Sequence, residues 1–480
     1  MADRRIRTLT LIGLTVAWLL APAPAFAQSE SDHTLSSLLP ELILREIRLP
    51  PPSTPGLSHS AHFSPFTVAE LQNPAVAIVN SFNQLMVVQL STFPIGSSSG
   101  GFSYAFDPAL GTLRRSTSSF GPLFAERAAT LGKGRMSAGF NYQHASYNRF
   151  EGSPLDDGSI KFYLRHQECC STGTGPPVPP FFGVEETPNG TLLNPFFEGD
   201  VIEAALSLDV STDVVSVFGN YGLTNRWDIG VAVPFVHVSM DASVQATIQR
   251  LATAGTLIHS FVQGQDVPRQ VFTSSGSASG LGDIEVRSKF RLMDFAGGGL
   301  AAAADMRFPT GNEEELLGGS TQLKLFLIQS GGNDRITQHL NVGYTISKGG
   351  DQVTAQPTTS ATPNFPDEFS YAAGVELVVE PRVTIIGDLV GRTLLDVGRL
   401  DLVSKTFQFQ PPGNPAPPIA SMNFDEFEPR AGNLNLLYGT AGVKVNPTGN
   451  LLISASVLFP LTDAGLKNRL TTIIGMEYAF

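Results

Sequence analysis

An uninterrupted alternation of apolar and polar residues is the feature that most constrains this chain. In the segment 236–248, every even-numbered residue is apolar and every odd-numbered residue is polar, thirteen in a row. Successive side chains point to opposite faces in a β-strand, whereas a helix would scatter residues of one kind around its axis. The pattern therefore predicts a strand with one apolar and one polar face.

The same alternation recurs along the chain, and its polar faces are often charged. In 283–292, the apolar residues alternate with Asp, Glu, Arg and Lys, and similar splits occur in 304–308, 368–377, 385–392 and 453–459. A soluble sandwich could present one such face to water, but the recurrence favours strands between lipid and an enclosed aqueous lumen. The composition agrees, with 42% hydrophobic and 15% charged residues.

The last strand of the sequence carries its apolar row to the final residue. Leu470, Thr472 and Ile474 share this face with Met476, Tyr478 and Phe480. The pattern resembles the C-terminal signal by which outer-membrane barrels are recognised for insertion. We expect Met476, Tyr478 and Phe480 to act as that signal, with the barrel assembly machinery as a partner.

The first residues predict export. Three arginines precede an apolar stretch at 9–20, and Ala25-Phe26-Ala27 fits the rule for signal-peptide cleavage. An uncleaved anchor is the alternative, but the apolar stretch is too short to span a bilayer. Cleavage would leave 28 basic and 42 acidic residues, a balance that argues against nucleic acid as a partner because phosphate binding needs concentrated positive charge.

Turns and long connections alternate after the first third of the chain. Short turns rich in Gly, Pro, Asn and Asp alternate with long polar loops at 150–198, 249–279, 309–319, 349–366, 396–432 and 461–467. This order predicts an all-β fold, a transmembrane antiparallel β-barrel of about 12 strands (alternatively 14), with the short turns periplasmic. The strands are expected at 134–149, 200–222, 226–248, 280–293, 298–309, 320–330, 335–348, 367–379, 382–395, 433–445, 449–460 and 468–480, with a bulge near 211–213.

The chain thus divides into a signal peptide (1–27), an N-terminal segment (28–132) and a barrel (133–480). Helical spacing is present at 35–47 and 75–89, and a hairpin is expected between 102–106 and 112–118. Two interpretations of the N-terminal segment stay open. It is either a plug or lid at the periplasmic mouth or in the lumen, or a loose periplasmic appendage.

The inward-facing charged residues are the candidate site, because charge is costly on the lipid face and tolerated in the lumen. They would line a constriction that sets selectivity, or form a salt-bridge network that stiffens the wall. Selectivity is expected from His237, Asp241, Asp283, Glu285, Arg287, Lys289, Arg291, Asp305, Arg307, Glu376, Asp388 and Arg392. Arg135, Lys324, Arg469 and Glu477 complete the row.

Other motifs give no catalytic, cofactor or metal site. Adjacent Cys169 and Cys170 cannot easily share one tetrahedral ion. The Gly96–Gly100 match to G-x-S-x-G lies in a Ser/Gly-rich stretch without the strand before and helix after that a nucleophile elbow needs. The acidic run Glu313–Glu315 is expected to be a solvated loop tip, or a bridge through divalent cations to lipopolysaccharide.

Four segments carry a resemblance to a known family. They are Tyr221–Phe235, Gly280–Leu292, Asp305–Ser320 and the closing strand. Together they resemble the outer-membrane proteins of the meta-pathway of phenol degradation, over approximately residues 135–480. The resemblance implies the cell outer membrane and transport of small, including aromatic, molecules. It transfers no defined binding residues.

The sequence therefore predicts an outer-membrane channel or transporter for small molecules, hydrophobic or aromatic solutes among them, by diffusion through the lumen. Its surroundings would be outer-membrane lipid and lipopolysaccharide. Two alternatives remain: a non-conducting structural barrel, and an outer-membrane lipid-modifying enzyme. An enzyme is not expected, because no Ser/His pair stands out in the sequence.

Overall fold

The computed structural model describes residues 34–50, 74–92, 101–107, 112–115, 117–165, 200–252, 259–348, 365–409, 411 and 420–480. The expected signal peptide, the Gly96–Gly100 motif and Cys169-Cys170 lie outside these residues. Among the residues that the structure describes, no helix is long and apolar enough to cross a membrane.

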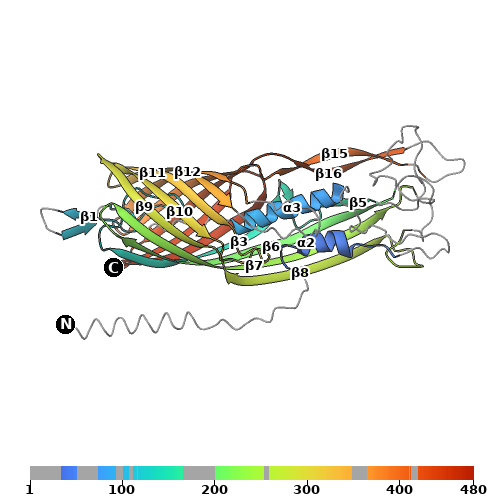
Figure 1. Cartoon of the computed structure of the whole chain (residues 1–480), viewed down its shortest axis with the longest axis horizontal. Coiled ribbons are helices and arrows are strands. Elements are labelled where there is room, and N and C mark those ends of the chain that lie inside the picture. The colour runs from blue at the N-terminus through green and yellow to red at the C-terminus, as the bar shows by residue number, and fades with distance from the viewer. Residues whose placement is uncertain are drawn as a thin grey trace, which may run out of the picture. The chain divides into compact units, whose positions relative to one another are not determined.

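Twelve antiparallel strands form a closed barrel, which confirms the predicted fold and strand number. The ring closes where the first strand, β3, pairs with β6 as well as with the last strand, β19. Figure 1 shows β9, β10, β11 and β12 side by side in this wall. The twelve strands are β3 (Met136–Phe150), β6 (Val201–Gly222), β7 (Trp227–Gln249), β9 (Ile284–Phe295), β10 (Gly298–Phe308), β11 (Thr321–Gly332), β12 (Ile336–Lys348), β13 (Glu368–Glu380), β14 (Val383–Leu394), β17 (Leu434–Val445), β18 (Leu451–Pro460) and β19 (Leu466–Ala479).

Further strands lie in segments that the sequence predicted as loops. β8 (Arg269–Leu281) pairs with β7, β5 (Ile160–Arg165) with β6, and β4 (Ser153–Pro154) with β3. β15 (Arg399–Phe409) and β16 (Ala420–Arg430) pair with each other. The loop prediction was wrong here, because Ser- and Gly-rich strands such as 273–280 have the composition of a loop. The predicted hairpin is confirmed as β1 (Tyr104–Asp107) with β2 (Thr112–Arg115).

The outer face of the barrel carries an apolar belt. Large side chains stand exposed around the wall, including Phe290 at 47% and Ile474 at 55%. Such a contiguous apolar surface needs lipid rather than water. The chain is an outer-membrane barrel. Met476, Tyr478 and Phe480 belong to this belt, and the insertion role of these three side chains remains a prediction.

We name the two ends of the barrel by their connections. The short-turn end carries the turns at 223–226, 296–297, 333–335, 381–382 and 446–450. The long-loop end is the opposite one. On β7, the exposed apolar row runs only over 227–235, nine residues from the short-turn end. At ~3.4 Å per residue and a tilt of ~40°, this row is ~23 Å tall, close to the apolar band of outer-membrane barrels.

β6 and β7 continue far beyond that band without changing phase. Twenty-two residue pairs join them in one unbroken register, from Val201↔Gln249 to Gly222↔Asp228. Even-numbered side chains face inward throughout. The bulge expected near 211–213 was therefore wrong. The surroundings change instead: inside the membrane, the inner face is polar and the outer face apolar, whereas beyond it the inner face is apolar and the outer face polar.

This reversal corrects two of the predicted lumen residues. His237 and Asp241 lie on the outer face of β7, where His237 Nδ1 is 2.7 Å from Ser279 Oγ and Asp241 is exposed. The apolar residues of 236–248 face inward instead and are mostly buried. Alternation alone shows that a strand has two faces, but it does not show which face is the inner one.

The part of β6, β7 and β8 that lies beyond the apolar belt is here called the extension. A second core fills it. Helices α2 (Leu38–Pro40), η1 (Glu41–Glu46) and α3 (Pro74–Ser91) lie in the two segments where helices were predicted. Their apolar residues pack with the inner faces of β6 and β7 in one buried cluster. The Phe82 ring of α3 lies 4.4 Å from that of Phe150 and 5.8 Å from that of Phe162. In Figure 1, α2 and α3 lie alongside β6, β7 and β8.

Candidate functional site: the occupied lumen

The lumen is lined with polar side chains that reach inward from every part of the wall. Several stand between two lipid-facing apolar neighbours, as Asp228 does between Trp227 and Ile229 on β7. Glu477 on β19 is buried three strands from β7 around the ring, and Lys444 on β17 is buried five strands away. The bore is therefore a polar space enclosed by lipid-facing strands.

Part of the N-terminal segment lies inside this space. Residues 117–134, here called the lumen segment, have no helix or strand of their own. Their backbone groups instead bond to side chains of the wall, which satisfies donors and acceptors that would otherwise be buried without partners. The segment contacts seven strands of the wall, namely β17, β14, β13, β12, β11, β9 and β7.

Asp388 of β14 is the most heavily used of these anchors. Its Oδ2 accepts hydrogen bonds from the backbone N–H groups of Leu123 at 2.9 Å, Phe124 at 2.7 Å and Ala125 at 3.2 Å. Three donors converging on one carboxylate oxygen are charge-assisted and hence stronger than neutral bonds. Asp388 thus fixes the middle of the lumen segment against the wall.

Two lysines hold the carbonyl groups of the same segment. Lys444 Nζ donates to Pro122 O at 2.7 Å, and Lys289 Nζ donates to Ala129 O at 3.0 Å. On β12, Asn341 makes a pair of bonds with Glu126, accepting from its N–H at 2.6 Å and donating to its carbonyl at 3.0 Å. Acidic, basic and amide side chains of the wall therefore all form hydrogen bonds with the backbone of the lumen segment.

A Ser–His–Glu row joins two further anchors. His339 Nδ1 lies 2.8 Å from Ser330 Oγ, and its Nε2 lies 2.5 Å from Glu376 Oε1. Ser330 Oγ accepts from Ala128 N, and the other Glu376 oxygen accepts from Gly121 N. The hydroxyl is thus buried beneath the lumen segment rather than open to a substrate. The three side chains therefore hold the lumen segment against the wall and do not present a nucleophile to a substrate.

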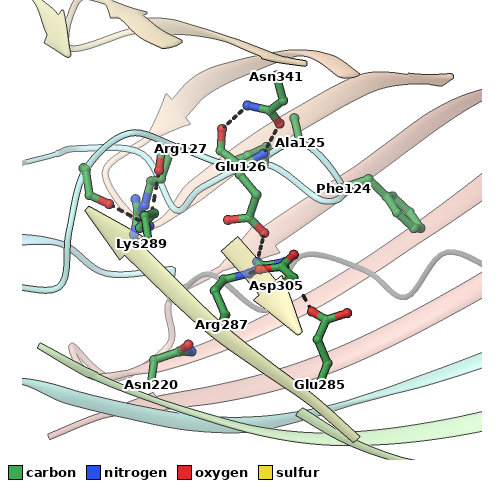
Figure 2. Close-up of polar contacts among 12 residues, drawn as sticks. Phe124, Ala125, Glu126, Arg127, Asn220, Glu285, Arg287, Lys289, Asp305 and Asn341 are labelled. Atoms are coloured by element: carbon green, nitrogen blue, oxygen red, sulfur yellow. Dashed lines mark hydrogen bonds and ion pairs between the residues drawn. The ribbon is translucent and has the colours of Figure 1, made fainter. Parts of the chain in front are cut away.

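A cavity of about 150 Å³ lies between the lumen segment and the wall on the side of the long-loop end. Arg287 is its centre: its Nε and Nη2 each lie 2.6 Å from an Asp305 oxygen, and its Nη1 pairs with Glu126 of the lumen segment. Figure 2 shows these groups pointing toward one another, with Glu285 beside them. Four basic and four acidic side chains line the cavity, namely Arg287, Arg307, Lys324, Arg392, Glu126, Glu285, Asp305 and Glu368.

Three aromatic residues, Phe124, Phe326 and Tyr371, complete the lining of the cavity. The Phe326 ring centroid lies 5.3 Å from Lys324 Nζ and 5.5 Å from the Arg287 guanidinium carbon. Phe124 of the lumen segment also lines the space. Cations over a ring face are attracted by its quadrupole. The cavity therefore combines apolar ring surface with paired charges of both signs.

The predicted site residues fall into separate groups. Glu285, Arg287, Asp305, Arg307 and Arg392 line the cavity together with Lys324. Lys289, Glu376 and Asp388 hold the lumen segment instead.

The remaining predicted residues lie away from the cavity. Asp283 accepts from the backbone of Gly311 and Gly319 and so ties down the loop after β10. Arg291 pairs with Asp294 in its own hairpin at 2.5 Å. Glu477 accepts from Gly101 N, while Arg135 lies at the short-turn end and Arg469 is exposed.

Sequence reasoning missed several partners of this site. Asp228 and Lys444 carry the same signal as the predicted residues, a lone charge between two apolar residues of a strand. Glu126 carries no such signal, because the lumen segment has no periodicity. Its pairing with Arg287 depends on how the segment is threaded.

Comparison with known proteins supports the resemblance found in the sequence. The family model described as "Putative MetA-pathway of phenol degradation" matches residues 201–394. No curated protein matches the chain.

Solved outer-membrane proteins are among the similar structures. The COG4313 outer membrane channel from Pseudomonas putida F1 has 11% identity and a TM-score of 0.38, covering 74% of this chain and 98% of that one. The toluene transporter TbuX of Ralstonia pickettii has 11% identity and a TM-score of 0.26, covering 73% and 90%. A Pseudomonas aeruginosa FadL homologue has 12% identity and a TM-score of 0.27, covering 79% and 94%.

The closed twelve-stranded wall, the lipid-facing belt and the polar bore agree with this family match. We conclude that the chain is an outer-membrane β-barrel whose residues 201–394 match the family model for the phenol-degradation pathway.

Proposed function

We propose that the barrel conducts small solutes of single-ring size, phenolic compounds among them, through the space between the lumen segment and the wall. The observation that best supports this proposal is the cavity of about 150 Å³ beside Arg287. An engineered protein cavity of roughly this volume accommodates benzene. A disaccharide would not fit unless the lumen segment moved.

The lining of the cavity supports a ring with a polar substituent. Phe124 and Phe326 offer apolar surface, while Arg287, Arg307 and Lys324 supply hydrogen-bond donors for a hydroxyl or carboxylate. Paired carboxylates balance the cations, so the space does not present a single sign of charge. A purely apolar molecule would have to displace solvent from these groups without replacing its hydrogen bonds.

Solute flux into proteoliposomes tests this proposal. We expect 4-hydroxybenzoate, which crosses a bare bilayer poorly, to enter faster than gluconate or sucrose. Phe326→Trp narrows the cavity and should reduce aromatic flux several-fold. The matched control is Phe290→Trp on the lipid face, which should leave flux unchanged.

Other results would contradict the proposal. If no solute enters faster than into empty liposomes, the alternative of a non-conducting structural barrel is favoured. If sucrose and 4-hydroxybenzoate enter equally, the lumen segment does not limit passage, and the size argument fails.

A further inference from the structure

The N-terminal region is anchored at both ends of the barrel. Its earlier part, residues 34–50 and 74–92, is here called the N-terminal module. This module packs at the long-loop end, where Ser36 N donates to Glu314 O at 2.9 Å and Gln89 Oε1 accepts from Leu466 N at 2.9 Å. Both partners belong to the long-loop end, Glu314 in the loop after β10 and Leu466 at the start of β19.

The later part of the region is fixed at the short-turn end. Gly134 N donates to Gly222 O at 2.8 Å, beside the turn between β6 and β7. Ser118 Oγ donates to Asp334 O at 2.7 Å, in the turn between β11 and β12. The β1–β2 hairpin also lies at this end, opposite to α2 and α3 (Figure 1).

The ends of the connection between these two parts both touch the inner wall. Thr92 O accepts from Arg392 Nη1 at 2.7 Å, and Gly101 N donates to Glu477 Oε2 at 2.7 Å. Arg392 is near the long-loop end of β14, whereas Glu477 is near the short-turn end of β19. Eight residues separate Thr92 from Gly101, and the nine Cα–Cα steps between them can span at most about 30 Å.

Both contacts are made on the inner side of the wall, by the buried side chains of Arg392 and Glu477. The wall is closed by the pairing of β3 with β6, so no seam lets the chain pass between strands there. A detour over the rim and along the outside of the wall would exceed the reach of eight residues. The described residues on either side of this connection, Thr92 and Gly101, therefore lie toward opposite ends of the lumen.

We propose that the N-terminal module lies on the outer surface of the cell and is joined to the barrel by a chain that threads the pore. Short turns of outer-membrane barrels face the periplasm, so the long-loop end faces outward. An exported chain starts on the periplasmic side. The module must then cross the membrane plane during assembly, either through the lumen or by the barrel closing around it.

The extension gives a physical reason for this arrangement. Beyond the membrane, the inner faces of β6 and β7 are apolar, with Ile202, Leu206, Val244 and Ala246 fully buried. The module covers this surface, which would otherwise be a large exposed apolar patch facing water. Delivery of the module to the outside is thus coupled to completion of the extracellular core.

Cysteine labelling in intact cells tests the proposal on the full chain. The background carries Cys169→Ser and Cys170→Ser. Arg48→Cys reports the module, because this side chain is exposed and its Nε donates to Arg45 O in its own segment. The matched control is Lys133→Cys, an exposed basic position at the short-turn end, and Arg430→Cys marks the long-loop end.

A membrane-impermeant maleimide should label Arg48→Cys as fully as Arg430→Cys, and Lys133→Cys at least tenfold less. Permeabilising the outer membrane should bring Lys133→Cys up to the same level. The proposal is overturned if Arg48→Cys is protected in intact cells while Arg430→Cys is labelled. Labelling of Lys133→Cys in intact cells would overturn it as well, because the orientation would be reversed. Faster migration of unheated samples on gels confirms that each variant is folded.

Discussion

Removal of the Asp388 carboxylate should release the middle of the lumen segment. Three backbone N–H groups, of Leu123, Phe124 and Ala125, share its Oδ2. In Asp388→Ala, all three donors lose their acceptor. An orphaned buried donor costs about 1–3 kcal/mol, and we take the low end because lumen water can replace part of the loss.

Three such donors at about 1 kcal/mol each give a loss of about 3 kcal/mol for the seated segment. Each 1.4 kcal/mol changes an equilibrium tenfold, so the unseated state should gain about 100-fold in population. Asp388→Asn keeps an acceptor oxygen in place but loses the charge. Its effect should therefore be much smaller than that of Asp388→Ala.

Single-channel recording in planar bilayers measures this shift. Asp388→Ala should show more frequent transitions to larger conductance, and Asp388→Asn should lie between it and the wild type. Asp401→Ala is the matched control, since Asp401 pairs with Arg430 in the exposed β15–β16 hairpin. If folded Asp388→Ala has the conductance and gating of the wild type, the segment is not held as we describe.

Three further predictions concern the extension, the cavity and the belt. Val244→Asp places a carboxylate in the apolar core of the extension and should lower the stability of that core by about 3 kcal/mol or more. The neighbouring outward substitution Gln245→Asp should be tolerated. Protease resistance of the extension in the two purified proteins compares them, and equal resistance would refute the inward placement. Lys324→Gln leaves the cavity net negative and should shift the reversal potential toward cation selectivity. Glu126→Gln should shift the reversal potential the opposite way, and shifts of the same sign would contradict the charge balance. Phe480→Ser should lower the amount of assembled barrel in cells without changing transcript level, and normal assembly would argue against the terminal signal.

The membrane-spanning fold could be predicted from the sequence because its physical signal is local. The wall strands from β9 to β19 place large apolar residues toward lipid and most of their charged residues toward the bore. In these strands, the period of two therefore predicts both the strand and which of its faces points to the lipid. Short turns rich in Gly, Asn and Pro separate these strands, so the strands could be counted from the sequence, and the count of twelve is confirmed.

The extension could not be interpreted in the same way. Its strands also alternate, but the apolar side chains of Val236–Ile248 face a helical core and not lipid. Nothing within those thirteen residues distinguishes the two cases. The distinction depends on α2, η1 and α3, which are more than 140 residues earlier in the chain.

The site was predictable only in part for a related reason. Arg287, Asp305 and Arg392 belong to strands and carry the alternation that identified them. The course of the lumen segment is set by long-range bonds such as Gly121 to Glu376, 255 residues apart. A segment without periodicity gives no local signal of what it will contact.

The most direct test of this account compares two truncated chains in planar bilayers. One lacks residues 28–92 and keeps the lumen segment. The other lacks 28–131 and so loses all of the lumen segment but residues 132–134, while both keep the twelve strands. We predict that loss of the lumen segment raises single-channel conductance several-fold over the first truncation. Equal conductance of the two folded barrels would show that the segment does not occupy the pathway, and would contradict the account.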